Sequence, residues 1–333
     1  MAFKAVCRTT FVLLLVTTLA FVALGKPMSG QVYCTTADPL GLVYRNLSSS
    51  REKRLIYDPV YQVSELGPHS WIAALRYGNR VQVFRDGKLV RCLALASMEC
   101  SILGWTNNAL IYRTPTGVYA LDVAKGSKRL SKHLAGAVTI HPAGDGYVSL
   151  VLLEGKLEAR LYRASDNEPT YNTQLPMSGR YWESLVVGDR YLVVWAKEYN
   201  DNGDFGRDSL RVVDLAQRTQ RVLPTDGLCQ GLAPGGSGDE LLVAYGQSSS
   251  VAGSASVEVE EVRLTDLSNR HLIAVAVRDS NLLALTADKT HLLMYVPYPD
   301  SGPGRPGKVF SVRLNDGHRQ IVREDVYECV PVE

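Results

Sequence analysis

The sequence predicts an all-β fold, a β-propeller, and a recurring hairpin carries this prediction. A short apolar run, a polar turn and a basic residue return at 118–123 (VYALDV), 210–215 (LRVVDL), 259–264 (VEEVRL) and 309–314 (VFSVRL). Each copy is typical of a β-hairpin. A single hairpin cannot bury its own apolar faces. A repeat of roughly forty to fifty residues therefore indicates units stacked around a shared core.

The two ends of the chain predict how the ring closes. Three short apolar runs, 31–34, 42–44 and 54–57, make an incomplete first unit, and residues 325–330 read as one strand without a partner in sequence. We expect this last strand to complete the first unit, which would leave no open sheet edge. The count favours seven four-stranded blades, with six as the alternative because the unit starting at Trp71 is short.

The N-terminus predicts export. Lys4 and Arg8 precede an uncharged apolar stretch that ends in small residues at Ala23 and Gly25. This is the pattern of a signal peptide over 1–25, cleaved after Gly25, which leaves one propeller domain over 26–333. The alternative is an uncleaved anchor, but the run is shorter than the roughly 20 apolar residues that span a bilayer. We expect a secreted or periplasmic protein without a transmembrane span after cleavage.

Charge excludes one class of partner. Cleavage removes Lys4 and Arg8 and no acidic residue, so the 36 basic residues of the whole chain fall to the number of its acidic residues, 34. The mature chain then has no basic excess, and no stripe of basic and aromatic residues. We therefore expect no nucleic-acid partner.

Five cysteines follow the cleavage site, and export permits disulfides. Closure of the ring would bring Cys329 beside Cys34, and we expect a disulfide there. Cys92 and Cys100, on consecutive strands, form a second candidate pair. The alternative is that all five are small buried side chains. Their spacing contains no CxxC, which argues against zinc.

The hairpins at 119–123 and 211–215 share an apolar-x-apolar-Asp-apolar pattern. In this they resemble the loose repeats of exported bacterial propellers, the TolB-like, YVTN-like and quinoprotein-like groups. The resemblance implies the propeller fold over most of the mature chain. It transfers no catalytic residue, because no Trp-Asp dipeptide, sialidase-type Asp box or tryptophan docking motif is present.

No motif predicts a catalytic residue, a cofactor or a metal. Residues 302–308 match the spacing of a phosphate-binding loop, but two prolines and a following strand contradict it. The acidic stretch 198–208 is out of register with a calcium loop. The six histidines are scattered without HxH or HExxH.

Loop length predicts a binding face. The connections 198–208, 247–256 and 297–308 are much longer than the tight turns at 114–117 and 154–156. We expect them to emerge on one face together with the loops that lead into first strands, and loops on a rigid scaffold commonly carry binding residues. The candidate binding residues are His69, Trp71, Tyr181, Trp182, Asn200, Asp201, Asp204 and Arg305.

The first hypothesis is a non-catalytic binding scaffold that engages a protein or glycan of the cell envelope. The alternative is a propeller enzyme, a hydrolase, lyase or lactonase with its site in the central channel. Convergence of His, Asp or Glu side chains in that channel, with perturbed pKa values, would favour the enzyme.

Overall fold

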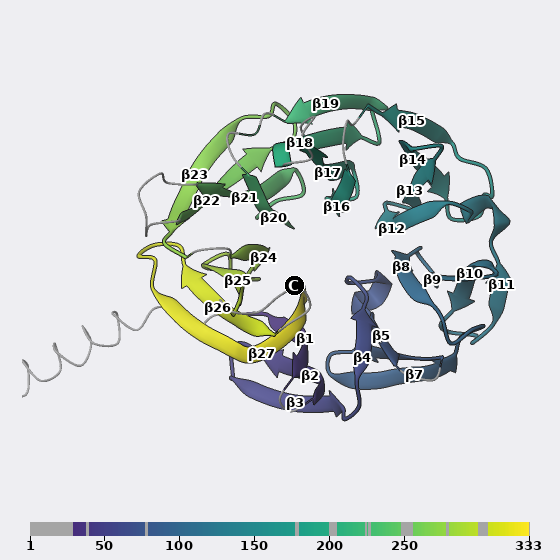
Figure 1. The fold of residues 1–333 in the computed structure, drawn as a ribbon, viewed down its shortest axis with the longest axis horizontal. Helices are drawn as coiled ribbons and strands as arrows, with labels where there is room; N and C mark the ends of the chain where they lie inside the picture. The colour runs from purple at the N-terminus through teal and green to yellow at the C-terminus, as the bar shows by residue number, and fades with distance from the viewer. Residues whose placement is uncertain are drawn as a thin grey trace, which may run out of the picture.

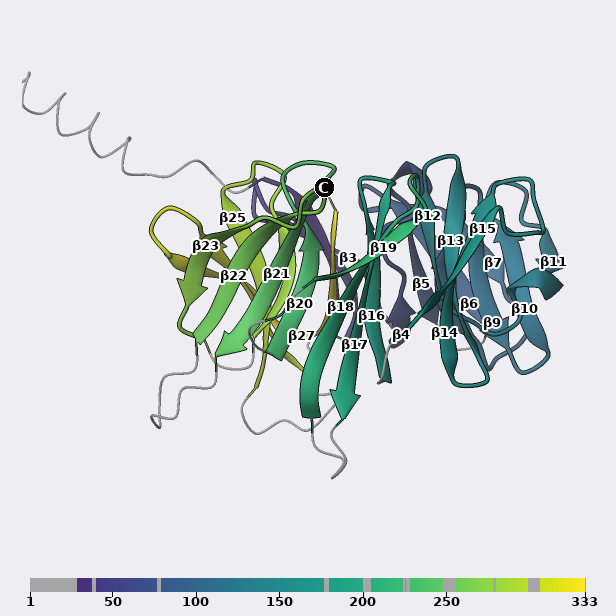
Figure 2. The same ribbon diagram turned by 90° about the horizontal axis from the view of Figure 1, so that it is seen from above.

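In the computed structural model, strands form a closed ring around one axis (Figure 1). The structure describes residues 29–37, 40–76, 79–176, 180–199, 205–223, 225, 228–247, 256–277, 280–298 and 306–332. Seen from the side, the strands run between the two faces of the ring (Figure 2). The predicted all-β propeller is confirmed. No helix in the described part of the chain is long and apolar enough to cross a membrane.

Three of the sheets have four strands each. They are β4 (Val60–Val63), β5 (Ile72–Arg76), β6 (Arg80–Arg85) and β7 (Lys88–Ala94); β16 (Arg180–Val187), β17 (Tyr191–Tyr199), β18 (Phe205–Asp214) and β19 (Thr219–Leu223); and β20 (Leu228–Pro234), β21 (Glu240–Gln247), β22 (Ser256–Arg263) and β23 (Asn269–Val275). The first strand of each set lies innermost in the ring, and the fourth lies outermost (Figure 1).

An eight-stranded sheet joins two such sets through a single parallel bridge between Ile140 and Gly104. Its strands are β8 (Ser101–Trp105), β9 (Ala109–Thr114), β10 (Gly117–Asp122), β11 (Lys128–Leu130), β12 (Ala137–Ala143), β13 (Gly146–Leu153), β14 (Lys156–Arg163) and β15 (Tyr171–Leu175). Two short 3-10 turns, η1 (Pro68–Ser70) and η2 (Lys132–Leu134), lie between strands.

The remaining seven-stranded sheet contains both ends of the domain. It runs in the order β24 (Asn281–Leu285), β25 (His291–Pro297), β26 (Gly307–Arg313), β27 (Arg319–Val332), β1 (Gln31–Ala37), β2 (Leu40–Asn46) and β3 (Arg51–Ile56). The first half of β27 pairs with β26, and its second half pairs with β1 from Gln31 opposite Val332 to Thr36 opposite Val326. The predicted closure by the C-terminal strand is therefore confirmed.

Taken in fours, the described strands fall into seven groups if the second half of β27 is grouped with β1, β2 and β3. This is the arrangement that the seven-blade prediction requires. Because two sheets continue from one group into the next, the sheets themselves number five, and the number of blades stays a prediction.

The burial of each strand follows from its sequence. The second strands are apolar along their length because neighbours cover both faces, as in β17 and β21, where residues 191–196 and 241–245 are all buried. Third strands such as β22 alternate valine and glutamate, which matches one covered and one open face. Between β6 and β7 the chain turns at Asp86 (φ 49°) and Gly87 (φ 67°), the left-handed pair that Asp-Gly favours in a tight hairpin.

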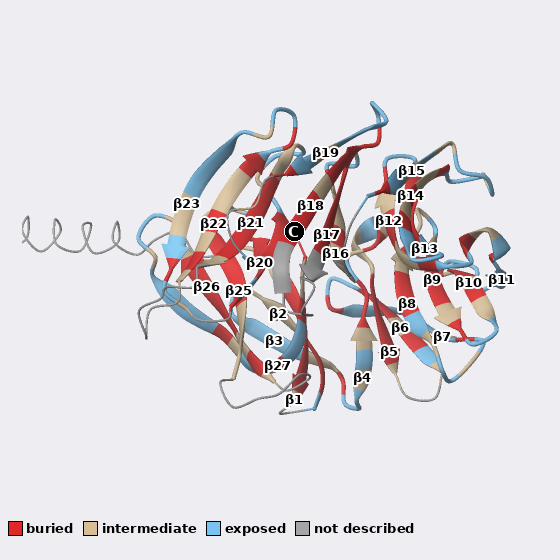
Figure 3. Ribbon diagram, turned by 45° about the horizontal axis from the view of Figure 1, so that its top comes forward, coloured by how far each residue is buried: buried red, intermediate tan, exposed pale blue. Residues whose placement is uncertain are grey.

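Buried residues lie along strands all around the ring (Figure 3), and each hydrophobic cluster that they form joins two neighbouring groups. Trp195 of β17 and Tyr245 of β21 belong to one such cluster. Tyr33 of β1 and Phe84 of β6 belong to another, which continues the core across the closure. Each fully buried large apolar side chain contributes roughly 1.5–3 kcal/mol. Since every cluster is shared, no group could keep its core without its neighbours.

The predicted start of the second unit is wrong. The sequence placed the first strand of the second unit at Trp71, but β4 (Val60–Val63) precedes it and pairs antiparallel with β5. β4 has four residues, of which only Val63 is fully buried, so its apolar pattern is too weak to detect. Trp71 consequently lies between the first and second strands of its group rather than at the start of the first.

Gly104 tests the packing of inner strands. Its φ is 137°, and an added Cβ would overlap the carbonyl oxygen of Ile140 on the next inner strand. We expect Gly104→Ala to lower the free energy of unfolding by at least about 2 kcal/mol, through backbone strain and overpacking. Gly144→Ala is the control: its φ is 55° with no atom near the new Cβ, so it should cost only about 1 kcal/mol. Urea unfolding measures both, and equal losses would contradict the close approach of β8 and β12.

Candidate functional site

The structure describes only part of the predicted binding face. Asn200, Asp201, Asp204, Arg305 and the side chain of Trp182 lie outside the described residues. Tyr181 is half-buried near the start of β16 and is paired with Ala196 of β17, the strand from which the predicted long connection 198–208 leads. This part of the prediction is not tested.

His69 and Trp71 do not share that face. Both follow β4, so they lie beyond the end of an inner strand, whereas Tyr181 lies at the start of one. The inner strands β8 and β12 are parallel, so both run from the same face of the ring to the other. If the other inner strands run the same way, the starts of inner strands lie on one face and their ends on the opposite face. The prediction that His69 and Trp71 belong to the long-loop face is wrong, because it depended on the misplaced first strand.

Six polar side chains from three groups meet near the axis of the ring, and we call them the axial cluster. Glu65 follows the inner strand β4, while the others lie on the inner strands β12 and β16. The members are Glu65, Thr139, His141, Tyr181, Glu183 and Ser184.

His141 is the centre of a hydrogen-bonded chain. Its Nδ1 lies 3.0 Å from a carboxylate oxygen of Glu65, and its Nε2 lies 2.8 Å from the Ser184 hydroxyl. The Tyr181 hydroxyl lies 3.1 Å from Ser184 Oγ. A carboxylate only accepts, so Nδ1–H donates to Glu65. In the neutral imidazole Nε2 then accepts from Ser184, whose oxygen accepts in turn from Tyr181.

Trp105 holds Glu65 in place. The fully buried indole of Trp105 donates from Nε1 to Ser64 Oγ (3.0 Å) and to the backbone carbonyl of Glu65 (3.2 Å). Its ring also lies against Gly67, where any Cβ would overlap it. The segment after β4 is therefore fixed on both sides of Glu65, although 62% of the Glu65 side chain is exposed.

The charge of Glu65 acts on the second glutamate of the cluster, Glu183. Burial, and then the nearby charge of Glu65, raise the pKa of Glu183 to about 7, although His141 acts in the opposite direction. Burial raises the pKa of Tyr181 to about 12, which keeps this hydroxyl protonated and able to donate. No Lys or Arg forms an ion pair with Glu65 or Glu183 among the described residues.

A third glutamate is crowded on the next inner strand. Glu328 of β27 accepts a hydrogen bond from the backbone N–H of Val63 at 3.3 Å, and desolvation raises its pKa to about 7. The residue as a whole is exposed to solvent, although desolvation of its carboxyl group is the largest cause of this shift. The axis of the ring is thus bordered by carboxyl groups with pKa values near neutrality.

The chain from Glu65 through His141 to Ser184 has the connectivity of an acid–histidine–serine triad. Ser184 is only 2% exposed, however, and its oxygen already bonds Tyr181 and His141. A nucleophile must reach its substrate, whereas here the solvent-accessible end is the Glu65 carboxylate. The arrangement is therefore better suited to presenting a fixed negative charge than to attack by Ser184.

The cysteines are only partly where they were predicted. Cys34 lies opposite Cys329 across β1 and β27, as expected. Both are free thiols in the structure, as are Cys92 and Cys100, so neither predicted disulfide is formed among the described residues. Cys92 is exposed on the outermost strand β7, and Cys100 packs on the core cluster of Trp105.

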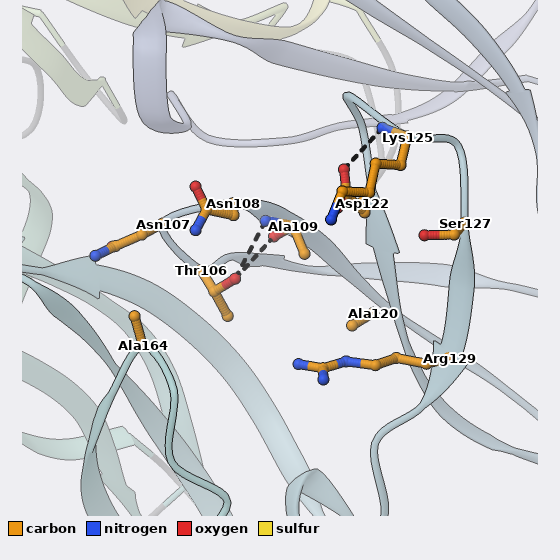
Figure 4. Close-up of a pocket in the computed structure, with 10 residues that line it drawn as sticks. All are labelled: Thr106, Asn107, Asn108, Ala109, Ala120, Asp122, Lys125, Ser127, Arg129 and Ala164. Carbon is orange, nitrogen blue, oxygen red and sulfur yellow. Dashed lines mark hydrogen bonds and ion pairs between the residues drawn. The ribbon is translucent and has the colours of Figure 1, made fainter.

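A surface pocket lies away from the axial cluster. It has a volume of about 320 Å³ and lies on the connections between β8 and β9 and between β10 and β11 (Figure 4). Lys125 reaches Asp122 at 3.9 Å, but the Lys125 side chain is 79% exposed. The pocket contains none of the axial cluster, and its polar groups are open to water. We therefore place the candidate site at the axis.

The described residues contain no group of three or more His, Cys, Asp or Glu side chains that could hold a metal ion. Of the axial cluster, the sequence analysis named only Tyr181, and it placed this residue on the loop face rather than at the axis. The available signal was a polar residue within otherwise apolar inner strands, such as His141 in 137–143 and Ser184 in 180–187. That signal marks single positions and does not show that they meet.

Comparison with known proteins supports the fold. No family model matches the chain, and no curated protein matches it. Among solved structures, it is similar to TolB from Acinetobacter baumannii (12% identity, TM-score 0.51), covering 92% of this chain and 66% of that longer one. It is also similar to a functionally unknown protein from Desulfotomaculum acetoxidans (13%, TM-score 0.54, 89% and 100% covered). A third is the dihydro-heme d1 dehydrogenase NirN (11%, TM-score 0.50, 92% and 74% covered).

These similarities define the class of protein, a β-propeller. More particularly, the fold resembles that of TolB at low identity. At this level of identity the comparisons show the fold alone, and the function has to be argued from the site.

The shifted pKa of Glu183 predicts a pH dependence. Between the ordinary value of 4.5 and the folded-state value of about 7, the native state keeps a proton that the unfolded state has lost. Stability from this group is therefore complete below 4.5 and is lost as the pH rises through about 7. We expect Glu183→Gln to stabilise the protein by roughly 1–3 kcal/mol at pH 8 and hardly at all at pH 4.

Urea unfolding at both pH values measures the difference. Glu168→Gln is the control, because Glu168 is exposed in the connection before β15. It should match the wild type at both pH values. A Glu183→Gln variant with the same pH dependence as the wild type would show that this carboxyl group is not crowded.

Proposed function

We propose that this protein is a secreted or periplasmic propeller that acts as a binding scaffold at the cell envelope, and that it captures a cationic group at the axial cluster. The observation that carries the proposal is the pair of carboxyl groups of Glu65 and Glu183. Burial, and then the charge of Glu65, raise the pKa of Glu183, and no Lys or Arg forms an ion pair with either carboxyl group among the described residues. A cation from a ligand would relieve this repulsion.

The supporting network makes Glu65 a fixed acceptor. His141 donates to its carboxylate, and Trp105 donates to its backbone. A fixed carboxylate loses little conformational entropy when it binds, which favours affinity. The preferred partner is a protein that presents Lys or Arg. These long side chains can reach the axis while the partner's backbone stays at the rim, and guanidinium binds carboxylates with two parallel hydrogen bonds.

The long connections form a separate part of the proposal, because Glu65 follows β4 whereas Tyr181 lies at the start of β16, toward the opposite face. We propose a further contact with a partner on the face at which Tyr181 lies, with Trp182, Asn200, Asp201, Asp204 and Arg305. Support comes from the sequence, in which the three long connections follow second strands of successive units. The N-terminal sequence supports export, and both points stay predictions.

Calorimetric titration tests the site with a short probe, the blocked tripeptide Gly-Arg-Gly. We expect binding that strengthens from pH 6 to pH 8 as Glu183 loses its proton, and at least a tenfold loss of affinity in Glu65→Gln, about 1.4 kcal/mol. The same peptide with citrulline, the neutral isostere of arginine, should not bind. Glu168→Gln serves as the matched protein control and should bind like the wild type.

Absence of binding, or equal binding of the arginine and citrulline peptides, would contradict the cation site. Binding of a glucosamine oligosaccharide in preference to the peptide would replace the protein partner with an amino-sugar glycan. Each result reports on the axial cluster, because Glu65→Gln leaves the outer surface unchanged.

The convergence of Glu65, His141 and Glu183 favours a second candidate, a hydrolase with its site at the axis. A carboxyl group with a pKa of about 7 can act as a general acid or base near neutral pH. This activity would use Glu183 rather than the buried Ser184.

A screen of p-nitrophenyl esters and glycosides tests this candidate. If it is correct, Glu183→Gln should lose on the order of a hundredfold or more in turnover, while Ser184→Ala keeps most of it. Turnover that is absent in the wild type, or that survives in Glu183→Gln, would eliminate the hydrolase.

A further inference from the structure

The ring is closed at one seam, and two cysteines face each other across it. β27 continues from β26 to β1, and Asp325 within it has a positive φ of 55° where the strand passes between them. Beyond this point, the strand forms the innermost element of the group that contains β1, β2 and β3 (Figure 1). Pairing of β27 with β1 is thus the only sheet contact in the described chain that joins its two ends.

Cys34 and Cys329 are direct partners in this antiparallel pair. Directly opposed residues in antiparallel strands have Cα atoms about 4.5–5.5 Å apart, within the range of about 4.4–6.8 Å that a disulfide accepts. The two Sγ atoms lie 3.0 Å apart, so the side chains already point toward each other. Backbone movement is not needed to join them.

The two cysteines lie in a buried, apolar environment. Cys34 is 1% exposed and Cys329 is 9% exposed, and both pack among apolar side chains such as Val32 and Val309. No metal-binding group exists among the described residues that could claim the thiols. We propose that Cys34 and Cys329 are oxidised to a disulfide in the exported protein, and that this bond covalently locks the ring at its seam.

The oxidant is a disulfide donor of the exporting compartment, such as a disulfide oxidoreductase or oxidised glutathione. One thiolate attacks a sulfur of the donor and forms a mixed disulfide, and the second thiolate then attacks the bonded cysteine sulfur. The two thiols lose two protons and two electrons, and the donor is reduced to two thiols. Electrons and atoms therefore balance without any further reactant.

Burial determines when the bond can form and how it behaves afterwards. The hydrogen bond to Cys34 and desolvation raise the pKa of the Cys329 thiol, which disfavours the reactive thiolate once the seam is closed. Exchange with the donor therefore takes place while β27 docks, and the finished bond is shielded from reductants. Its loop spans 295 residues, and in the chain-entropy model a long loop gains the most stabilisation from a disulfide.

Mass spectrometry of the exported full-length protein tests the proposal. After denaturation in iodoacetamide without reductant, we expect Cys34 and Cys329 in one linked peptide pair, lighter by two hydrogens than the separate peptides. Reduction in denaturant should release both. Recovery of Cys34 and Cys329 as alkylated thiols, even after refolding in oxidised glutathione, would overturn the proposal, as would a link from either one to a different cysteine.

Thermal unfolding tests the lock itself. Cys34→Ala/Cys329→Ala should lower Tm by on the order of 10 °C relative to the oxidised wild type. Its Tm should not respond to reductant. Cys229→Ala is the matched control, because Cys229 is a buried cysteine of another sheet. This variant keeps Cys34 and Cys329, so reduction and alkylation in denaturant, followed by refolding, should still lower its Tm. A double variant as stable as the oxidised wild type would show that the bond does not lock the seam.

The two tests fail independently of the proposed function. Neither cysteine touches the axial cluster, so loss of peptide binding in Glu65→Gln would persist whether or not the disulfide forms. Formation of the disulfide without peptide binding would support only the disulfide, and peptide binding without the disulfide would support only the proposed function.

Discussion

Pairing of β27 with β1 is the contact on which the rest of the structure depends. A strand at the edge of an open sheet leaves backbone donors and acceptors unpaired, and a ring removes this problem only if its ends meet. Here the second half of one long strand supplies the meeting point. Since the hydrophobic clusters lie between neighbouring groups, opening the seam would expose the Tyr33 cluster on one side and the Cys34 cluster on the other.

Closure also places the candidate site. Glu65 and His141 are 76 residues apart in sequence, and His141 and Ser184 are 43 residues apart, yet all three belong to one hydrogen-bonded chain. Only the common orientation of the inner strands brings them together. A buried network of this kind stabilises the protein when every polar atom has a partner and destabilises it when one is missing. The network thus rigidifies the axis while it leaves one carboxylate of the chain facing solvent.

Repeated and local features of the fold could be predicted from the sequence. Features that depend on one short strand or on contacts between distant residues could not. Apolar runs of regular spacing specified the hairpins, and the unpaired run at 325–330 specified the closure and the Cys34–Cys329 register. The four-residue strand β4 escaped notice because it buries so little, and this moved His69 and Trp71 to the wrong face. The axial cluster could not be predicted, because one sequence gives no angle between successive groups and therefore no meeting point for His141 and Ser184.

The protonation state of the His141 ring shows whether Glu65, His141 and Ser184 meet at the axis. In nitrogen-15 NMR of histidine-labelled protein at about pH 9, where histidine is ordinarily neutral, the signal lost in His141→Gln identifies this residue. We predict a slowly exchanging proton on Nδ1 and an unprotonated Nε2, since Nδ1 donates to Glu65 and Nε2 accepts from Ser184. A proton on Nε2, or two tautomers in rapid exchange, would show that the hydrogen-bonded chain from Glu65 through His141 to Ser184 does not form.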